Sequence, residues 1–143
     1  MSKEWSPQIS YYMRNSLYNH VITEATSFVG SRGNDPALQF WKAVATGMLG
    51  QPNAGVRELE ELRSKRDVAY PVLAALLFFH QREVSPDEMA MEEIMREMTG
   101  AEQQASGVSE LITAGFFFYT GNYYEARRWI RRALPDGKIT SSW

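Results

Sequence analysis

Residues 111–134, LITAGFFFYTGNYYEARRWIRRAL, contain the pattern that decides the fold of this chain. Apolar residues recur every three or four positions on both sides of Gly121-Asn122, which is typical of two amphipathic helices joined by a tight turn. Gly115 and Ala126 are small residues where the two helices must approach each other closely. The stretch therefore predicts an antiparallel helix hairpin.

The same pattern recurs along the chain. In the second helix of each expected hairpin a small residue is followed four positions later by an aliphatic one, and these small residues are separated by 30, 35 and 36 residues. A tetratricopeptide repeat (TPR) is about 34 residues long, with W-x2-L-G-x2-Y in its first helix and A-x3-F in its second. The first-helix pattern is approximated from Leu111 and again from Trp41. The four second-helix pairs are Ala25/Val29, Gly55/Leu59, Ala90/Ile94 and Ala126/Ile130. These spacings predict a helical repeat.

The predicted fold is all-α, a TPR-like right-handed superhelix of antiparallel hairpins with about eight helices in four repeats. We expect one solenoid segment over residues 1–143. Proline after a capping residue marks helix starts at Ser6-Pro7, Asp35-Pro36 and Ser85-Pro86, and Asn53 is a further expected cap. Gly30 and Gly33 are expected to end the second helix. The expected repeats are 6–33, 34–66, 67–106 and 107–135. Before the last hairpin we expect helices at 6–17, 18–29, 36–49, 54–64 and 68–80, and one from 86 to a polar break at 100–107.

Composition limits the classes of function. The chain has 15 basic and 17 acidic side chains and a formal net charge of −2, which argues against strong affinity for nucleic acid. It has no cysteine, so it has no disulfide framework and no thiolate site, which fits a cytoplasmic protein. No signal peptide is expected, and the longest apolar run, 72–79, is too short for a transmembrane segment.

The sequence does not indicate an enzyme. His20 and His80 are the only histidines, and neither belongs to a metal or catalytic signature. No glycine-rich phosphate loop follows a strand, and no nucleophile–base pair is evident. We therefore expect no catalytic residues, no metal and no cofactor.

Three surfaces are candidates for binding. In a TPR stack the first helices line the concave face, where an aromatic groove can bind a peptide or a helix. The aromatic members of this set can equally pack against a neighbouring repeat. Four arginines around Trp129 can form a basic patch for an acidic partner or an anionic headgroup, or can simply be solvated on the outer face of their helix. A methionine stripe on the helix from Pro86 is either core or a soft recognition surface. The concave-face residues are Gln39, Lys42, Thr46, Ile112, Phe116 and Tyr119; the arginines are Arg127, Arg128, Arg131 and Arg132; the stripe contains Met91, Ile94, Met95 and Met98.

Several blocks of sequence resemble one family more closely than the general TPR pattern does. They follow the order found in the N-terminal region of the TPR subunit of intraflagellar transport complex A. Lys65-Arg66-Asp67-Val68 is the most distinctive block. The others are Tyr11-Tyr12, Asn34-Asp35-Pro36, Phe40-Trp41-Lys42-Ala43, Arg57-Glu58-Leu59-Glu60 and Gly121-Asn122-Tyr123-Tyr124-Glu125-Ala126-Arg127.

The resemblance implies that this chain is the first part of a very long TPR solenoid. It further implies a non-enzymatic scaffold in retrograde ciliary transport and ciliary protein trafficking, located in the cytoplasm and the cilium. Its partners would be other subunits of a transport complex or peptide segments. A TPR adaptor for chaperone C-terminal peptides is the rival interpretation, but it needs a clamp of Lys, Asn and Arg. Lys42 fits such a clamp, whereas residues 68–79 contain no basic residue. An all-helical enzyme or lipid-binding domain is the third class.

Overall fold

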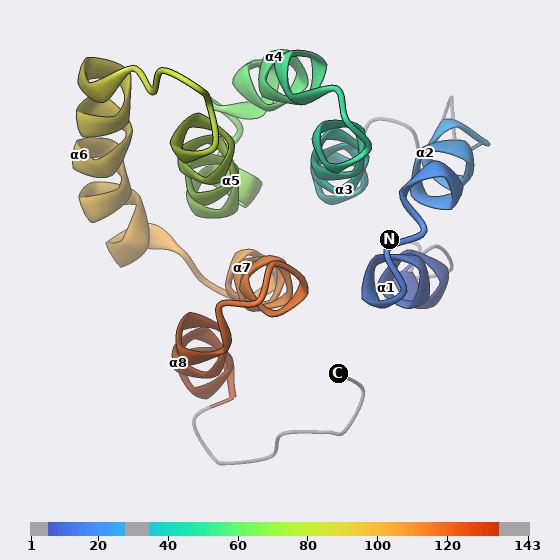
Figure 1. Cartoon of the computed structure of the whole chain (residues 1–143). Coiled ribbons are helices and arrows are strands. Elements are labelled where there is room, and N and C mark those ends of the chain that lie inside the picture. Colours follow the sequence, from blue (N-terminus) through green and yellow to red (C-terminus); the bar gives the residue numbers. More distant parts are fainter. Residues whose placement is uncertain (1–5, 28–34, 135–143) are drawn as a thin grey trace. The chain divides into compact units, whose positions relative to one another are not determined.

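The computed structural model describes residues 6–27 and 35–134, and all regular structure in these residues is helical (Figure 1). The chain divides into two compact units, Met1–Lys65 and Arg66–Trp143. The division falls at the end of the second expected repeat, 34–66. The predicted all-α helical-repeat fold is therefore confirmed, whereas the assignment of one continuous solenoid stays a prediction.

The described residues of the first unit form four helices that pack in chain order. α1 packs against α2, α2 against α3, and α3 against α4. α3 begins where the sequence predicts, because the Asp35 side chain accepts a hydrogen bond from the Ala37 N–H (3.0 Å) and Pro36 occupies the first turn. The helices are α1 (Ser6–Arg14), α2 (Tyr18–Ser27), α3 (Pro36–Met48) and α4 (Pro52–Leu62).

The contact between α3 and α4 is a close approach of two backbones. A Cβ atom added to Gly55 would lie 2.8 Å from the Gly47 Cα and 3.0 Å from the Ala43 carbonyl oxygen. Atoms at these distances overlap, so only glycine fits at position 55 in this arrangement. The small residue that the repeat pattern places here is therefore the point of tightest contact.

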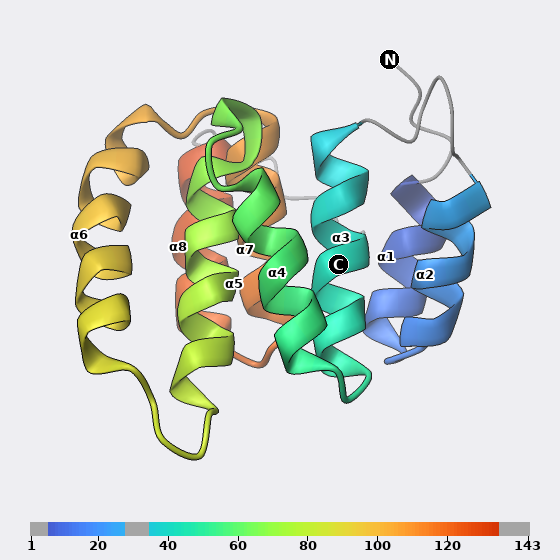
Figure 2. The ribbon, with the colours of Figure 1, turned by 90° about the horizontal axis from the view of Figure 1, so that it is seen from above.

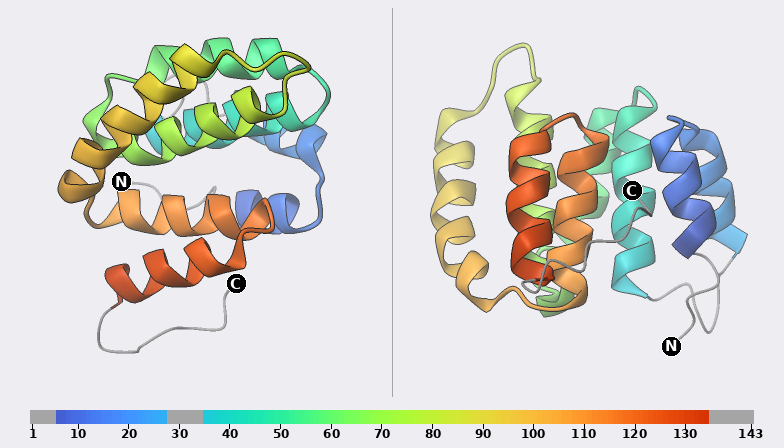
Figure 3. Two further views of the ribbon diagram at one scale, coloured as in Figure 1. Left: turned by 60° about the vertical axis from the view of Figure 1, so that its left-hand side comes forward. Right: turned by 90° about the horizontal axis from the view of Figure 1, so that it is seen from below.

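The second unit is organised around α5, which packs against both α6 and α7; α7 in turn packs against α8 (Figures 2 and 3). α5 is buried over most of its surface, as its nearly continuous apolar sequence predicts. The elements are the 3-10 helix η1 (Arg66–Val68), α5 (Ala69–Gln81), α6 (Glu88–Gln104), α7 (Val108–Tyr119) and α8 (Tyr123–Ala133).

The small residues of the four repeated pairs do not all have the same environment. Ala25, Gly55 and Ala126 are buried, whereas Ala90 is partly exposed. Val29, the aliphatic member of the first pair, lies outside the described residues, as do the expected helix-ending glycines, Gly30 and Gly33. The repeat pattern thus marks a buried small residue in three hairpins and a partly exposed one in α5–α6.

Helix boundaries differ from the predictions in three hairpins. α1 ends at Arg14, because Ser16 adopts a positive φ of 56° before the chain enters α2. α4 begins at Pro52, with Gln51 and not Asn53 at the cap position. In α6 the capping residue is Asp87, which accepts from the Ala90 N–H (3.1 Å), so Ser85-Pro86 precedes the helix.

The polar break expected at 100–107 is also wrong in its extent. α6 continues through Gly100 to Gln104, because an isolated glycine weakens a helix without necessarily ending it. No described helix combines the length and hydrophobicity needed to cross a bilayer.

Candidate functional site

The position of α8 is set by the turn that precedes it. Gly121 has φ +88°, a left-handed conformation that glycine adopts without strain. The Asn122 side chain then accepts a hydrogen bond from the Glu125 N–H (3.3 Å), and the helix begins at Tyr123. The Gly-Asn pair therefore both ends one helix and starts the next, as the sequence predicts.

The inner face of α8 is built on Trp129. This side chain is fully buried, and Ala126 and Ile130 are buried beside it. The indole ring lies against the ring of Tyr70 from α5, with centroids 4.6 Å apart. The guanidinium carbon of Arg132 lies 4.6 Å from the indole centroid, within the range of a cation–π interaction. Trp129 therefore holds α8 against the rest of its unit.

Two arginines of α8 are used inside the unit. Arg128 donates to Glu102 at 2.9 Å and to Glu125 at 2.9 Å. Arg132 donates to the Glu110 carboxylate at 2.8 Å and to the carbonyl oxygens of Ala105 (2.9 Å) and Glu102. These bonds connect α8 to the end of α6 and to the start of α7. Arg128 and Arg132 thus fix the α6–α7 connection.

Two side chains in the surroundings of Trp129 have shifted pKa values. Hydrogen bonds to Glu102 and Glu125 raise the pKa of the Arg128 guanidinium. Burial, with a smaller contribution from the Glu102 charge, raises the pKa of Tyr70 to about 12. Both groups therefore keep their ordinary charge state at neutral pH.

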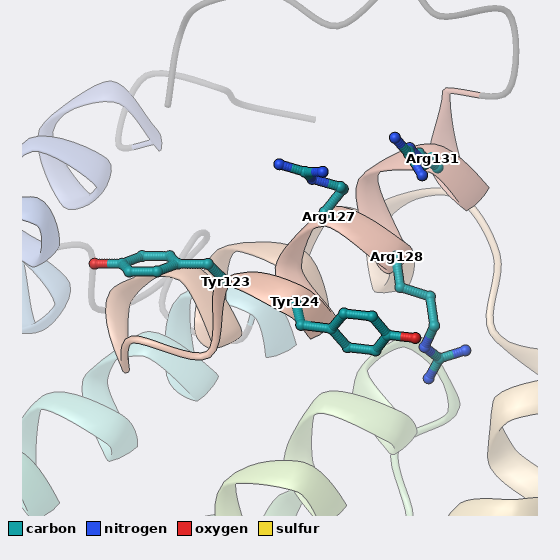
Figure 4. Close-up of a pocket in the computed structure, with 5 residues that line it drawn as sticks. All are labelled: Tyr123, Tyr124, Arg127, Arg128 and Arg131. Atoms are coloured by element: carbon teal, nitrogen blue, oxygen red, sulfur yellow. The ribbon is translucent and has the colours of Figure 1, made fainter.

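The outer face of α8 has a different character. Tyr123 and Tyr124 are 64% and 77% exposed, and Arg127 and Arg131 are exposed as well. Together with Arg128, they line an open pocket of about 500 Å³, and all five side chains project from α8 (Figure 4). We call Tyr123, Tyr124, Arg127 and Arg131 the α8 surface. Its residue types are those enriched in protein–protein interfaces.

The structure divides the predicted basic patch in two. Arg128 and Arg132 neutralise glutamates of their own unit, and only Arg127 and Arg131 have their side chains directed to solvent. Residues three and four apart share a helix face, which is why Arg127 and Arg131 lie together, one turn from Tyr124. The sequence shows four equivalent arginines; their partners become visible only when α6 and α7 are placed.

Three of the expected concave-face side chains are not displayed. Thr46, Ile112 and Phe116 are buried, and the Phe116 ring packs edge-on against Phe78 of α5, with centroids 5.6 Å apart. The expectation assumed one open face on each first helix. In fact α3 packs against both α2 and α4, and α7 against both α5 and α8. Phe116 therefore packs against a neighbouring helix, which is the alternative to display on the concave face.

The remaining concave-face residues, Gln39, Lys42 and Tyr119, are partly exposed, and their role in binding stays a prediction. Leu111, expected on the packed face of α7, is 42% exposed. The packed side of α7 is therefore rotated toward Ile112 relative to the sequence-based register.

The methionine stripe of α6 is only partly core. Ile94 is the buried side chain of this helix, Met91 and Met98 are partly exposed, and Met89 and Met95 are 81% and 47% exposed.

The two histidines have local contacts: His20 packs beside Tyr12, and the His80 Nδ1 lies 3.3 Å from a Glu83 carboxylate oxygen. Within residues 6–27 and 35–134, no three potential ligands come together to hold a metal ion.

Helices packed as consecutive hairpins around shared apolar faces define a helical-repeat protein. Comparison with known proteins identifies the family. Residues 9–142 match the family described as the tetratricopeptide repeat protein 21 N-terminal ARM repeat, and the chain belongs to this family. The match confirms the family that the sequence motifs indicated. ARM repeats, like TPRs, are helical repeats that stack into solenoids.

The similar proteins are much longer than this chain. It is 29% identical to human tetratricopeptide repeat protein 21B over 99% of its own length, and 31% identical to the mouse protein of that name over 94%. It is 26% identical to mouse tetratricopeptide repeat protein 21A over 94% of its length. In each case the chain spans 11% of the relative.

Sequence reasoning missed the two tyrosines of the α8 surface. In the sequence these residues stand out only as part of the family block that begins at Gly121. A signal was present, because Tyr124 falls on the same helical stripe as Arg127 and Arg131, opposite Trp129 and Ile130. An aromatic residue on the polar stripe of an amphipathic helix indicates a surface role.

Proposed function

We propose that this chain is a non-enzymatic segment of a protein–protein interaction scaffold. The observation that supports the proposal best is the α8 surface, where two exposed tyrosines and two exposed arginines stand on a helix held rigidly by Trp129. Tyrosine and arginine are common among the residues that dominate binding energy at interfaces, and rigid presentation lowers the entropic cost of binding.

We further propose that the scaffold acts within intraflagellar transport complex A, in retrograde ciliary transport and the trafficking of ciliary proteins. Membership of the tetratricopeptide repeat protein 21 family and the blocks shared with the N-terminal region of the transport subunit support this assignment. Its site of action would be the cilium and its base. Its partners would be other subunits of the complex.

Affinity purification from ciliated cells tests this function. The tagged chain is expressed, recovered at low detergent, and its co-purifying proteins are identified by mass spectrometry. We expect subunits of the transport complex to be enriched over a Trp129→Ala control, in which α8 loses its anchor. Recovery of chaperones in place of transport subunits would contradict the proposal.

The rival function as a chaperone adaptor has less support. Lys42 is partly exposed, but α5 offers no basic residue between Ala69 and Phe79 to complete a carboxylate clamp. Peptides with a free C-terminus can be compared with their amidated forms in a binding titration. Tight binding that needs both the free carboxylate and Lys42 would favour the adaptor.

A further inference from the structure

The α8 surface has a net positive charge within a chain that is slightly acidic overall. Glu125 is the one acidic residue of α8, and it is paired with Arg128. Among the described residues, no hydrogen bond or ion pair involves Arg127 or Arg131. The guanidinium groups of these two residues are therefore available to an external anion.

The arginines lie beside two aromatic side chains that stay exposed in the folded unit. Tyr123 and Tyr124 keep most of their side chains in solvent, next to the arginine stripe on the same helix. An exposed aromatic pair beside paired cations suits a ligand that carries both negative charge and an apolar group. The Tyr123 ring contacts Phe118 of α7, with centroids 5.6 Å apart, yet Tyr123 stays 64% exposed and Tyr124 is 77% exposed.

We infer that the α8 surface binds an acidic segment of a protein partner, with carboxylates at Arg127 and Arg131 and an apolar side chain against Tyr124. This inference rests on the proposed scaffold function and assigns the surface and the chemistry of its partner. Charge complementarity supports it, because the planar guanidinium group matches the two oxygens of a carboxylate.

Other anionic ligands fit less well. Attraction to anionic membranes needs clusters of about four to eight basic residues, and only two arginines are available here. Nucleic-acid binding likewise depends on neutralising several phosphates along a basic face. A second copy of the chain offers glutamates on the solvent face of α6, among them Glu92 and Glu93, and this possibility is an outcome of the test.

The experiment uses a fluorescein-labelled amphipathic peptide of Glu and Leu and its twin in which every Glu is Gln. Fluorescence anisotropy is measured with the 143-residue chain and with the variant Arg127→Gln/Arg131→Gln. The control Arg57→Gln/Arg96→Gln removes the same charge from exposed positions on α4 and α6. Circular dichroism verifies that all variants keep the melting temperature of the parent chain.

We expect the Glu peptide to bind and the Gln peptide to fail. The Arg127→Gln/Arg131→Gln variant should weaken binding about tenfold, since two exposed ion pairs are lost, and the control should change it little. High salt should weaken binding, and Tyr124→Ser should weaken it without changing the salt dependence. Equal binding of the two peptides, or an equal loss in the control, would overturn the inference.

Three further outcomes also overturn it: no binding of either peptide, stronger recruitment to phosphatidylserine vesicles than to the peptide, or a dimer of the chain that Arg127→Gln/Arg131→Gln dissociates. The two proposals fail in distinguishable ways. If transport subunits still co-purify with this double variant, the scaffold function stands and the α8 assignment is wrong. If the parent chain recovers none, the scaffold function itself is wrong.

Discussion

The hairpins α5–α6 and α7–α8 belong to the same unit and carry the same small-residue signature, yet they pack very differently. In α7–α8 the turn is short, and α8 buries Ala126, Trp129 and Ile130. In α5–α6 the connection runs from 82 to 87, and the long helix α6 buries Ile94 alone, with Ala90 at the equivalent position partly exposed. The second helix of α7–α8 therefore buries three side chains, whereas the second helix of α5–α6 buries one.

The difference shows what the signature reports. A small residue permits two helices to approach, but a large neighbour must fill the space on either side for the approach to be stable. Trp129 and Ile130 do this next to Ala126. On α6, Ile94 is buried four positions after Ala90, but the other large apolar side chains are flexible methionines, and Met89 and Met95 are 81% and 47% exposed. The signature therefore identifies a hairpin without specifying how tightly it closes.

The largest test of this contrast is Trp129→Ala. Removing a fully buried indole should cost about 3–5 kcal/mol of unfolding free energy, measured by urea denaturation. Trp129→Phe should cost much less, because the indole N–H has no hydrogen-bond partner among the described residues. A loss below about 1 kcal/mol for the alanine variant would contradict the view that Trp129 locks α8.

A second test uses Tyr70, which joins the two hairpins through its ring contact with Trp129. Its pKa is raised from 10.0 to about 12, so the folded state keeps the phenol proton where the unfolded state loses it. Stability from this group is fully present below pH 10 and is lost as the pH rises to about 12. Between these limits the parent chain should lose roughly 2–3 kcal/mol more than Tyr70→Phe.

Urea unfolding of both proteins at several alkaline pH values measures this difference. The Tyr70→Phe variant is the matched control, because it keeps the ring contact and lacks the titrating group. Parallel stability curves for the two proteins would show that Tyr70 titrates normally in the folded state.

The fold was largely predictable because it depends on local signals. The period of the apolar residues and the Asp35-Pro36 and Gly121-Asn122 boundaries act within a few residues, and the structure confirms them. The predictions were wrong where two neighbouring residues could serve the same role or where a signal was weak. Asp87, and not Ser85, is the cap of α6, and the helix continues past Gly100. Local sequence does not decide such competitions, since the energy differences are about 1 kcal/mol.

The site was less predictable because it depends on what surrounds each helix. From the sequence alone Phe116 is expected to be displayed, but in the structure its ring packs against Phe78 of α5. The sequence does not distinguish Arg128 and Arg132 from the other two arginines of α8. The structure does, because Arg128 pairs with Glu102 of α6 and Arg132 with Glu110 of α7. These partners are more than 20 residues away in sequence, beyond the reach of any helical period.

A third test places the same larger side chain at the two equivalent small positions, beginning with Ala126→Leu. Ala126 is buried where α8 meets α7, so three extra carbon atoms have no space without displacing neighbours. We expect a loss of about 1–3 kcal/mol in unfolding free energy by urea denaturation. An unchanged melting temperature would show that the crossing lies elsewhere on α8.

The smallest effect should come from the matched substitution Ala90→Leu in α6. Ala90 is partly exposed, leucine has a high helix propensity, and the neighbouring methionines can move aside, so no buried packing must change. We expect the unfolding free energy to stay within about 0.5 kcal/mol of the parent value in the same urea assay. Ile94→Ala serves as the control, because Ile94 is the buried contact of α6 and its truncation should cost about 2–5 kcal/mol. If Ala90→Leu destabilised the chain as much as Ala126→Leu, α5–α6 would be as tightly closed as α7–α8, and the contrast between the two hairpins would be wrong.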